Sequence, residues 1–365
     1  MAEMKIITQK IERIESHDNA ERLAIAFTDI FDWPIIVGKN SFKPGDKVVH
    51  FPVDCVVDEK IEDILLGGSK IKLSKGRIRA AKIRGVVSYG ILCPLSELKK
   101  HFSMGSWEGD LMKSLGCRKY EPPVNGSSQG KTGQKTKKRQ NRNFDKYFDM
   151  NHLQNRKGIF DDDDIVSITE KLHGTSFRAG YVKRDISGFF AQIFHKIRKV
   201  FDKNADSEFV YGSRNVQLQN NKYDRSLYKQ MVGKYNLKSL PKDVVVYGEI
   251  VGPGIQKNYQ YTEFPELFIY DVKNPDYMNT LEKLTFIKRR RYKSVPMLDD
   301  NIPWKYIKDS LHEYFNFGSQ LDPSQKIMEG IVIEKVSEEV CKFGRKKVKV
   351  LNPKYLLNKD NTDFH

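Results

Sequence analysis

The sequence predicts an α+β fold in which a small N-terminal β-barrel is followed by a larger domain of mixed strands and helices. Short β-branched runs alternate with turn signals in the first third of the chain, and the pattern then changes to strands mixed with helices. Between the two regions lies a segment rich in Lys, Gln and Gly that contains no acidic residue. With 365 residues, the chain is long enough for two ordinary domains.

The N-terminal strands are predicted at residues 5–14, 33–38, 47–53, 78–83 and 86–92, with a tight turn at residues 42–46. Short strands at this spacing suit a Greek-key barrel of the OB type. In residues 76–85 basic side chains occupy alternating positions, so we expect them on one face of a strand. That face is either simply solvated or binds the phosphates of a nucleic acid.

Residues 122–143 read PPVNGSSQGKTGQKTKKRQNRN and cannot bury enough apolar surface to offset the entropy of ordering. We interpret them as a flexible basic linker, which is either a solvated tether or a segment that contacts phosphates. The expected domains are therefore an OB-fold nucleic-acid-binding module at residues 1–121 and a second domain at residues 144–365.

The composition bears on partners and location rather than on the fold. A formal net charge of +16 favours a polyanionic partner, either nucleic acid or an acidic membrane surface. No apolar run is long enough to span a bilayer, and the N-terminus lacks the features of a signal peptide. The four cysteines are widely spaced, which suits neither a zinc site nor a disulfide framework. We expect a soluble intracellular protein of the cytoplasm, monomeric, with no membrane association and no protein partner.

The second domain carries charged and aromatic residues at the ends and faces of its predicted strands. A strand-like run at residues 165–168 leads into Glu170-Lys171-Leu172-His173-Gly174, where the glycine permits a sharp turn after the lysine. Further residues of this kind follow along the chain: Arg214, Glu249, Phe268, Glu329, Lys347 and Lys349. Since Lys347 and Lys349 are two positions apart, both project from the same strand face.

In this order, the motifs resemble those of the covalent nucleotidyltransferase superfamily, which comprises ATP-dependent ligases and mRNA capping enzymes. The match covers about residues 144–353: a nucleophilic lysine, an arginine strand, a Tyr-Gly-Glu strand, an aromatic strand, a Glu-Gly strand and a Lys-x-Lys strand. The resemblance implies a mixed α/β nucleotidyltransferase (ATP-grasp-like adenylation) domain built on antiparallel sheets.

Two features narrow the resemblance to RNA ligases. The nucleophile motif has His173 where DNA ligases and capping enzymes typically have an aspartate, which is similar to the phage nick-sealing RNA ligases. An OB module before the catalytic domain and the stretch Lys119-Tyr120-Glu121-Pro122-Pro123 resemble the Deinococcus-type RNA ligases. The resemblance therefore implies an ATP-dependent RNA ligase that joins a 3′-OH to a 5′-phosphate, with RNA ends or nicked duplexes as substrates.

The expected chemistry begins with Lys171, which attacks the α-phosphorus of ATP and carries AMP covalently. A lysine must lose its proton to do this, and neighbouring cations (Lys347, Lys349 and Arg214) together with a metal ion lower its pKa. Lys347 and Lys349 also neutralise the charge that develops on the phosphate. His173 is expected to assist the transfer steps, and its presence removes a metal-facing carboxylate.

The remaining roles concern the nucleotide and the metal. Glu249 and Glu329 are hard oxygen donors that suit Mg²⁺ or Mn²⁺. By resemblance, Phe268 stacks on the adenine, Glu170 positions the base, and Arg214 contacts the ribose, the α-phosphate or the RNA. Leu172 and Ser176, next to the nucleophile motif, complete the expected nucleotide-contacting residues.

Other functions remain open at this stage. A DNA ligase or an mRNA guanylyltransferase would use the same covalent lysine, although each typically carries a C-terminal OB domain that the sequence does not extend to. A protein of a different class, a non-catalytic RNA-binding OB protein, would require the acids and lysines of the second domain to be incidental. Plain core packing of Phe268 and Tyr247, a surface role for Glu249 and a solvated run around Lys347 are the corresponding structural alternatives.

Overall fold

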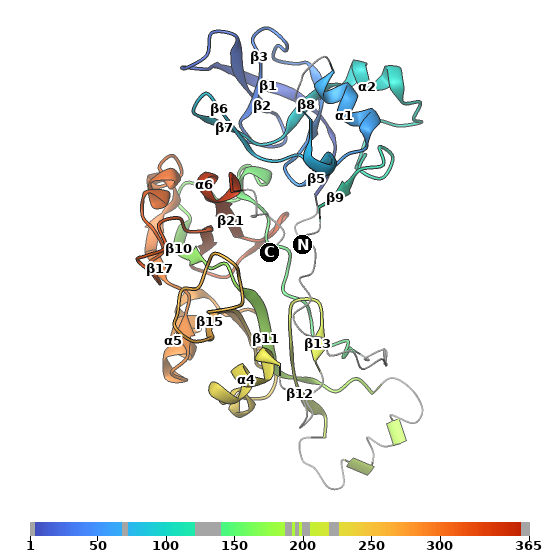
Figure 1. The fold of residues 1–365 in the computed structure, drawn as a ribbon. Coiled ribbons are helices and arrows are strands. Elements are labelled where there is room, and N and C mark those ends of the chain that lie inside the picture. The colour runs from blue at the N-terminus through green and yellow to red at the C-terminus, as the bar shows by residue number, and fades with distance from the viewer. Residues whose placement is uncertain are drawn as a thin grey trace. The chain divides into compact units, whose positions relative to one another are not determined.

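The computed structural model describes residues 4–67, 72–120, 140–186, 192–193, 197–198, 205–218 and 226–358 (Figure 1). The chain forms two compact units. The first comprises Met1–Asn125, Asp149–Ile159 and Val348–Phe364, and the second comprises Gly126–Phe148 and Phe160–Lys347. Residues 149–159 and 348–358, which the sequence places in the C-terminal domain, thus group with the barrel.

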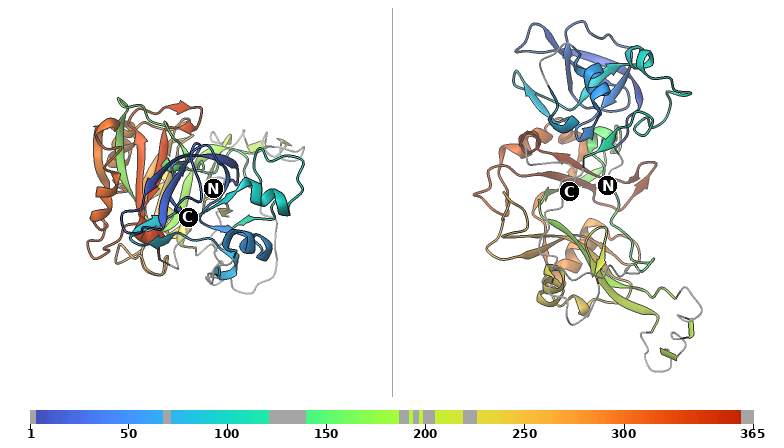
Figure 2. Two further views of the ribbon diagram at one scale, coloured as in Figure 1. Left: turned by 90° about the horizontal axis from the view of Figure 1, so that it is seen from above. Right: turned by 45° about the vertical axis from the view of Figure 1, so that its right-hand side comes forward.

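The first unit is built on a five-stranded antiparallel sheet of order β3-β2-β1-β4-β8, seen from above in Figure 2, left. Its edge strands β3 and β8 also contact each other, so the barrel is nearly closed, and the predicted OB-type fold is confirmed. The strands are β1 Thr8–Ser16, β2 Leu23–Thr28, β3 Ile35–Gly38, β4 Lys47–Phe51, β5 Cys55–Val56, β6 Ala81–Ile83, β7 Val86–Ser88, β8 Ile91–Pro94 and β9 Arg118–Lys119. The helices are α1 Glu59–Leu66, α2 Leu95–His101 and α6 Pro353–Leu356, with 3₁₀ turns at Ser74–Gly76 and Leu153–Asn155.

Strand β1 holds this barrel together because it pairs with two neighbours. Its first part pairs with β4 and its second part with β2, and the register shifts between Ile11 and Arg13, where the strand bends. Alternating residues of β1 and β2, including Ile11, Ala24 and Ala26, fill the barrel interior. The helices α1 and α2 cover a second apolar cluster around Ile61 and Leu98.

The predicted basic strand at residues 78–83 is wrong in most of its length. Only Ala81–Ile83 is extended in a ladder, and Arg77 is buried, with Nη2 2.6 Å from Asp54 Oδ1 and its guanidinium stacked on Tyr120. Arg77 therefore stabilises the barrel and does not present its charge to a ligand. The sequence also gave no expectation of β2, since its alternating alanines have low strand propensity.

The second unit contains two main sheets (Figure 2, right). One has four strands in the order β17-β10-β18-β21, and the other has six in the order β13-β12-β11-β14-β15-β16. The strands are β10 Ile165–Lys171, β11 Thr175–Lys183, β12 Ser207–Gly212, β13 Gln217–Leu218, β14 Val245–Val251, β15 Glu266–Lys273, β16 Lys293–Ser294, β17 Met297–Pro303, β18 Gly330–Lys335, β19 Val340–Cys341, β20 Gly344–Arg345 and β21 Lys347–Leu351. The helices are α4 Leu227–Lys234 and α5 Thr280–Arg289, with 3₁₀ turns at Leu237–Ser239, Trp304–Tyr306 and Leu311–Asn316.

One face of the six-stranded sheet packs into the hydrophobic core of this unit, and the opposite face carries Ser176, Glu249 and Phe268. Phe177, Val246, Leu267 and Ile269 belong to the core cluster, which α4 and α5 cover. Apart from the short parallel pair β15–β16, the ladders in this sheet are antiparallel. The expected α+β domain on antiparallel sheets is confirmed.

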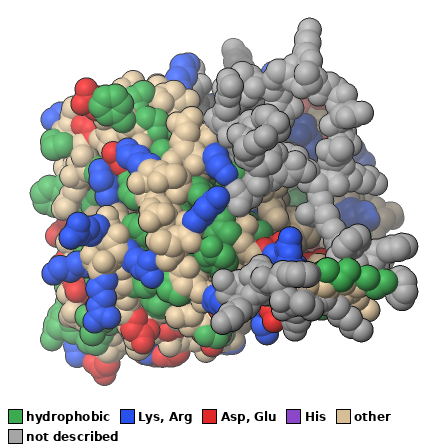
Figure 3. Space-filling model, turned by 90° about the horizontal axis from the view of Figure 1, so that it is seen from below, with side chains coloured by type: hydrophobic (Ala, Val, Ile, Leu, Met, Phe, Trp, Pro, Cys, Tyr) green, Lys and Arg blue, Asp and Glu red, His purple; other side chains and the backbone are tan. Residues whose placement is uncertain are grey.

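The predicted linker lies mostly outside the described residues. Its C-terminal end is described, and there Asn141 is buried, with its side-chain amide donating to the carbonyl of Lys183 and to Glu208. Among the helices of the described residues, none is long and apolar enough to cross a membrane. Lys and Arg side chains are scattered over the face drawn in Figure 3, in keeping with the net charge of +16.

Candidate active site

The site is built from residues that the strand registers of the two sheets bring into line. In the six-stranded sheet, Ser176 on β11 pairs with Glu249 on β14, and Glu249 pairs with Phe268 on β15. Directly paired residues point to the same face of a sheet, so these side chains form a row across three strands. In the four-stranded sheet, Lys171 at the end of β10 pairs with Gly330, the residue after Glu329.

Lys171 and Glu329 form the central contact of the site. The Lys171 Nζ donates to Glu329 Oε1 at 2.6 Å, with the lysine side chain 16% exposed and the glutamate 1% exposed. Contact with a carboxylate favours the charged form of the amine. Both residues are sequence-predicted, and the structure brings them together across 158 residues of chain.

The turn after Lys171 is packed tightly against β14. The backbone N–H of Gly174 donates to Glu249 Oε1 at 3.2 Å, and a Cβ added at Gly174 would lie 2.2 Å from the carbonyl oxygen of Ile250. Only glycine fits this approach without displacing backbone. The turn therefore fixes the end of β10, and with it Lys171, relative to Glu249.

His173 lies within this turn and is buried. Burial, together with the charge of Lys171, lowers its pKa to about 3, so the imidazole is neutral near pH 7. Its Nδ1 is 3.7 Å from Glu329 Oε2 and its ring packs edge-on against Tyr259. Its backbone N–H donates to the hydroxyl of Tyr261 at 3.0 Å.

Glu249 is half-buried, and its carboxyl lies near other charges. Burial, and to a smaller extent the charge of Glu329, raise its pKa, while Lys171 and Arg214 lower it, and the net result is a pKa of about 8. The charged form of Glu249 therefore lacks sufficient compensation in the ligand-free protein. A divalent cation or a cationic group at this position would supply it.

Two residues that the sequence assigns to the nucleotide base are each buried. Glu170 is buried, and its Oε2 accepts the backbone N–H of Gln320 at 2.9 Å; burial raises the pKa of its carboxyl. Phe268 is 4% exposed and, among the described residues, is not part of the core cluster of the six-stranded sheet. The Nζ of Lys293 lies 5.7 Å from the centroid of the Phe268 ring.

The smaller contributors are also placed by the strands. Arg214 follows β12, its backbone N–H donates to Ser176 Oγ at 3.1 Å, and burial lowers the pKa of its guanidinium. Leu172 is buried between Lys171 and the turn. Ser176 thus links the arginine segment to the row that contains Glu249.

Lys347 is bound by carboxylates that the sequence did not single out. Its Nζ lies 2.6 Å from Glu334 Oε2 and 3.2 Å from Asp271 Oδ2, and all three side chains are buried. The cations Lys347 and Arg345 hold the pKa of Asp271 well below its usual range despite burial. Asp271 follows Phe268 in the predicted aromatic strand, so the sequence predicted its place on that strand. Its ion pair with Lys347 could not be predicted.

Lys349, two positions further along β21, belongs to the first unit because the division between the units falls inside this strand. Its side chain is 5% exposed, its backbone N–H donates to the carbonyl of Asn151 at 2.9 Å, and it forms a parallel bridge with His152. Strand alternation places it on the same side of β21 as Lys347.

Other contacts of the site were not expected from the sequence. Tyr261 holds the backbone of His173, and Gln256 Nε2 donates to the carbonyl of Gly174 at 2.6 Å. Both lie between β14 and β15, in a segment without a motif. In the sequence, these two residues differ from their surroundings only as polar side chains in a region rich in aromatic residues and glycine.

The donor set bears on metal binding. Among the described residues, no three His, Cys, Asp or Glu side chains gather closely enough to enclose a metal ion. However, Glu329 Oε2 is a buried oxygen without a hydrogen-bond partner in the described part of the chain. Glu249 is close enough to Glu329 for its pKa to be raised by the charge of Glu329. Two carboxylates fit a cation that retains most of its waters, as Mg²⁺ does, but not a fully enclosed metal.

Comparison with known proteins agrees with this arrangement. The model of the RNA ligase family matches residues 164–351, and a model of an OB-fold domain matches residues 6–95. No curated protein matches the chain.

Several solved structures share the fold. The Naegleria gruberi RNA ligase with PPi is 20% identical, with a TM-score of 0.69 over 96% of this chain and 97% of that one. A lysine-to-alanine mutant of that ligase with ATP and Mn is also 20% identical, with a TM-score of 0.71 over 98% of this chain and 100% of that one. The family model covers more than half of the sequence and includes Lys171, Glu249 and Glu329. The chain therefore belongs to the RNA ligase family.

Proposed function

We propose that this protein is an ATP-dependent RNA ligase that seals breaks between a 3′-OH and a 5′-phosphate, chiefly nicks in duplexes. The reaction would pass through AMP on Lys171 and then through AMP on the 5′-phosphate end. The observation that carries the proposal is the Lys171–Glu329 contact, placed beside Glu249 in a family whose members join RNA. The matches to the RNA ligase family model and to an OB-fold domain model support the proposal.

The covalent step fits the position of Lys171. Its amine would attack the α-phosphorus of ATP, the bond to the β-phosphate would break, and pyrophosphate would leave. The ammonium proton must depart first, and Glu329 Oε1 lies within hydrogen-bonding distance of the amine. A lysine at the end of a strand, held by a turn that only glycine permits, has the fixed orientation that in-line attack requires.

The nucleotide would bind over the row of side chains that Ser176, Glu249 and Phe268 form across the six-stranded sheet. Phe268 would supply a stacking face for adenine, since its ring lies on the sheet face opposite the core. Glu170 has a buried Oε1 that lacks a hydrogen-bond partner among the described residues and would accept a hydrogen bond from the base. Arg214 and Ser176 lie at the side where the sugar and phosphate would follow.

A divalent cation would be held by Glu249 and Glu329. It would supply positive charge near the α-phosphate and weaken the hold of Glu329 on the ammonium. Structures of the Naegleria gruberi ligase with ATP and Mn and with AMP and Mn support the choice of nucleotide and metal. We propose Mg²⁺ or Mn²⁺ for this protein.

Label transfer tests the covalent step. Incubation with α-labelled ATP and Mg²⁺ or Mn²⁺ should yield a labelled protein, and Lys171→Ala should abolish the label. Lys242→Ala, at an exposed lysine of the same unit, is the matched control and should remain labelled. Preferential labelling by GTP would show a guanylyltransferase instead, and persistent labelling of Lys171→Ala would refute the assignment of the nucleophile.

Sealing assays test the substrate. A nicked duplex with RNA at the 3′-OH side should be sealed faster than the same ends on single strands, and faster than a nick with DNA at that side. Equal rates on single-stranded ends would refute the nick preference. Faster sealing of the DNA nick would identify a DNA ligase.

A further inference from the structure

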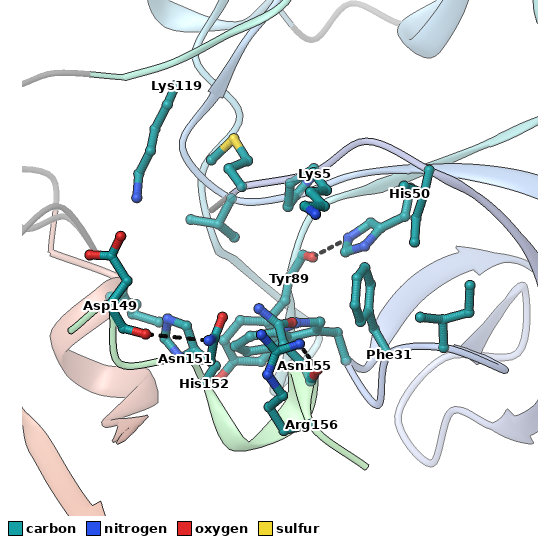
Figure 4. Close-up of a pocket in the computed structure, with 17 residues that line it drawn as sticks. Lys5, Phe31, His50, Tyr89, Lys119, Asp149, Asn151, His152, Asn155 and Arg156 are labelled. Carbon is teal, nitrogen blue, oxygen red and sulfur yellow. Dashed lines mark hydrogen bonds between the residues drawn. The ribbon is translucent and has the colours of Figure 1, made fainter. Parts of the chain in front are cut away.

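The first unit contains a cavity of about 650 Å³ that the proposed chemistry at Lys171 does not use (Figure 4). The barrel forms one side of it and residues 149–156 form the other. Its volume lies within the range of about 300–1,000 Å³ that is usual for small-molecule sites. Lys5, Ile30 and Asp149 at its rim are exposed, so the cavity opens to solvent.

The two sides of the cavity are joined by specific contacts. Trp33 Nε1 donates to Asn155 Oδ1 at 2.6 Å, and the backbone N–H of Asp32 donates to the carbonyl of Gln154 at 2.9 Å. Lys157 Nζ donates to the carbonyl of Thr28 at 2.8 Å. The segment is therefore anchored on the barrel, and the cavity is a built feature of this unit.

One wall of the cavity is aromatic. Trp33 packs against Tyr89, with ring centroids 4.8 Å apart, and against His152 at 5.1 Å. Phe31 lies beside His50, which is held by its Nε2 contact of 2.9 Å with the carbonyl of Tyr89. Aromatic side chains that line an open cavity provide stacking faces for a planar ligand.

The other feature of the cavity is positive charge. Lys5, Lys119 and Arg156 line it, against a single carboxylate, Asp149. Figure 4 shows Lys119 extending from the barrel side toward Asp149, while Arg156 lies farther away, on the opposite side of the cavity. A cavity lined by both cations and aromatic rings suits a ligand that has both a phosphate and a planar base. A lipid chain would lack partners for the cations, and a metal ion would lack carboxylates.

We propose that this cavity holds one nucleotide of the RNA strand, with its base against Phe31, Trp33 and Tyr89 and its phosphate toward Lys5, Lys119 and Arg156. The inference rests on the proposed function and deepens it, since it assigns the barrel a defined contact with the RNA. This contact is separate from the basic residues of the stretch 76–85, of which Arg77 is buried in an ion pair.

The position of the cavity along the chain favours RNA over a separate small molecule. Its opposite side is tied to β21, since the backbone N–H of Lys349 donates to Asn151 and His152 bridges to Lys349. Lys349 belongs to the Lys-x-Lys strand expected to contact the reacting phosphate. A nucleotide in the cavity would therefore lie against a segment that is hydrogen-bonded to this strand, as expected for one part of a longer substrate.

Photocrosslinking tests the proposal directly. Unsealable nicked RNA duplexes, each with a single 5-iodouridine at a successive position on either side of the nick, are irradiated with the full-length protein without ATP. At one position the label should attach to the tryptic peptide of residues 23–39, which contains Phe31 and Trp33, or to the peptide with Tyr89. Labels that attach elsewhere at every position would overturn the proposal.

Binding assays on the same RNA provide an independent test. Phe31→Ala should weaken affinity by about 5- to 150-fold, as expected for the loss of base stacking, and Phe31→Tyr should restore it if the alanine variant is unstable. Lys5→Ala should reduce the slope of log affinity against log salt by about 0.7–0.9, whereas Lys39→Ala, an exposed lysine outside the cavity, should not.

The outcomes separate this proposal from the proposed function. Failure of the wild-type protein to attach AMP would refute the ligase mechanism, while crosslinking and affinity, measured without ATP, would still judge the cavity. If Phe31→Ala and Lys5→Ala retained RNA affinity but needed more ATP for AMP attachment, the cavity would serve ATP, and the proposal would be overturned.

Discussion

His50 makes the stability of the barrel depend on pH in mildly acidic solution. It lies on β4, is 2% exposed, and its Nε2 contacts the carbonyl of Tyr89. Burial lowers its pKa from 6.5 to about 4, and this outweighs the contact with the carbonyl, which favours the protonated form. In the native protein the imidazole is therefore neutral at pH 7 and donates through Nε2–H.

The size and sign of the effect follow from this pKa. Because the native pKa is the lower one, the unfolded chain binds the proton first as the pH falls. The contribution of His50 is complete above about pH 6.5 and is lost progressively down to about pH 4. At 1.36 kcal/mol per pH unit, the loss amounts to about 3 kcal/mol, a large part of the roughly 5–15 kcal/mol that stabilises a typical domain.

Urea unfolding at a series of pH values, followed by tryptophan fluorescence, measures this effect. The wild-type protein should lose about 3 kcal/mol relative to His50→Gln between pH 6.5 and 4. The two proteins share every other titrating group, so their difference isolates His50. His101→Gln, at an exposed histidine of the same unit, shows whether removing any histidine has this effect. A constant difference between wild type and His50→Gln over that range would refute the reasoning.

The other predictions concern the second unit. Asp271→Asn should lower the free energy of unfolding by about 3–5 kcal/mol, because it leaves buried lysine and arginine charges uncompensated, whereas the exposed Asp300→Asn should have little effect in the same thermal melt. Gly174→Ala should abolish AMP attachment in the label-transfer assay, because its Cβ would meet backbone at 2.2 Å; Gly233→Ala, in helix α4 with nothing within 4 Å, should not. Phe268→Leu should raise the ATP concentration needed for half-maximal labelling by about 5- to 150-fold, and an unchanged requirement would rule out stacking.

The strand motifs of the site could be predicted because each combines local strand propensity with one conspicuous polar residue at a strand end. Runs of β-branched residues placed β10, β14 and β18, and the charges on or beside them marked Lys171, Glu249 and Glu329. Once strands are assigned, antiparallel pairing limits which strand ends can meet. The order of the motifs along the chain therefore carried most of the information about which residues lie together. The register that sets Glu249 opposite Ser176 and Phe268 is a property of the assembled sheet.

The contacts that the sequence did not reveal depend on long-range packing. Gln320 reaches Glu170 across 150 residues through a backbone N–H, which has no side-chain signature. The pairing of Arg77 with Asp54 required the barrel to close, and an alternating charge pattern alone cannot distinguish a solvated arginine from a buried one. The cavity in the first unit combines barrel residues with a segment far along the chain, for example Trp33 with Asn155, 122 positions apart, which is beyond the reach of local patterns.

The two central lysines of the second unit are both paired with carboxylates, but the consequences differ. Lys347 is held by Glu334 and Asp271, and Asp271 is also bound by Arg345, so removing the charge from Lys347 would leave two buried carboxylates short of compensation. Lys171 pairs with Glu329, and Glu329 keeps an oxygen without a hydrogen-bond partner among the described residues. A cation that bound this oxygen would compensate Glu329 when the amine becomes neutral. The carboxylates around Lys347 are thus all engaged by cations, whereas the pair of Lys171 and Glu329 leaves one carboxylate oxygen for the cation that the proposed mechanism needs.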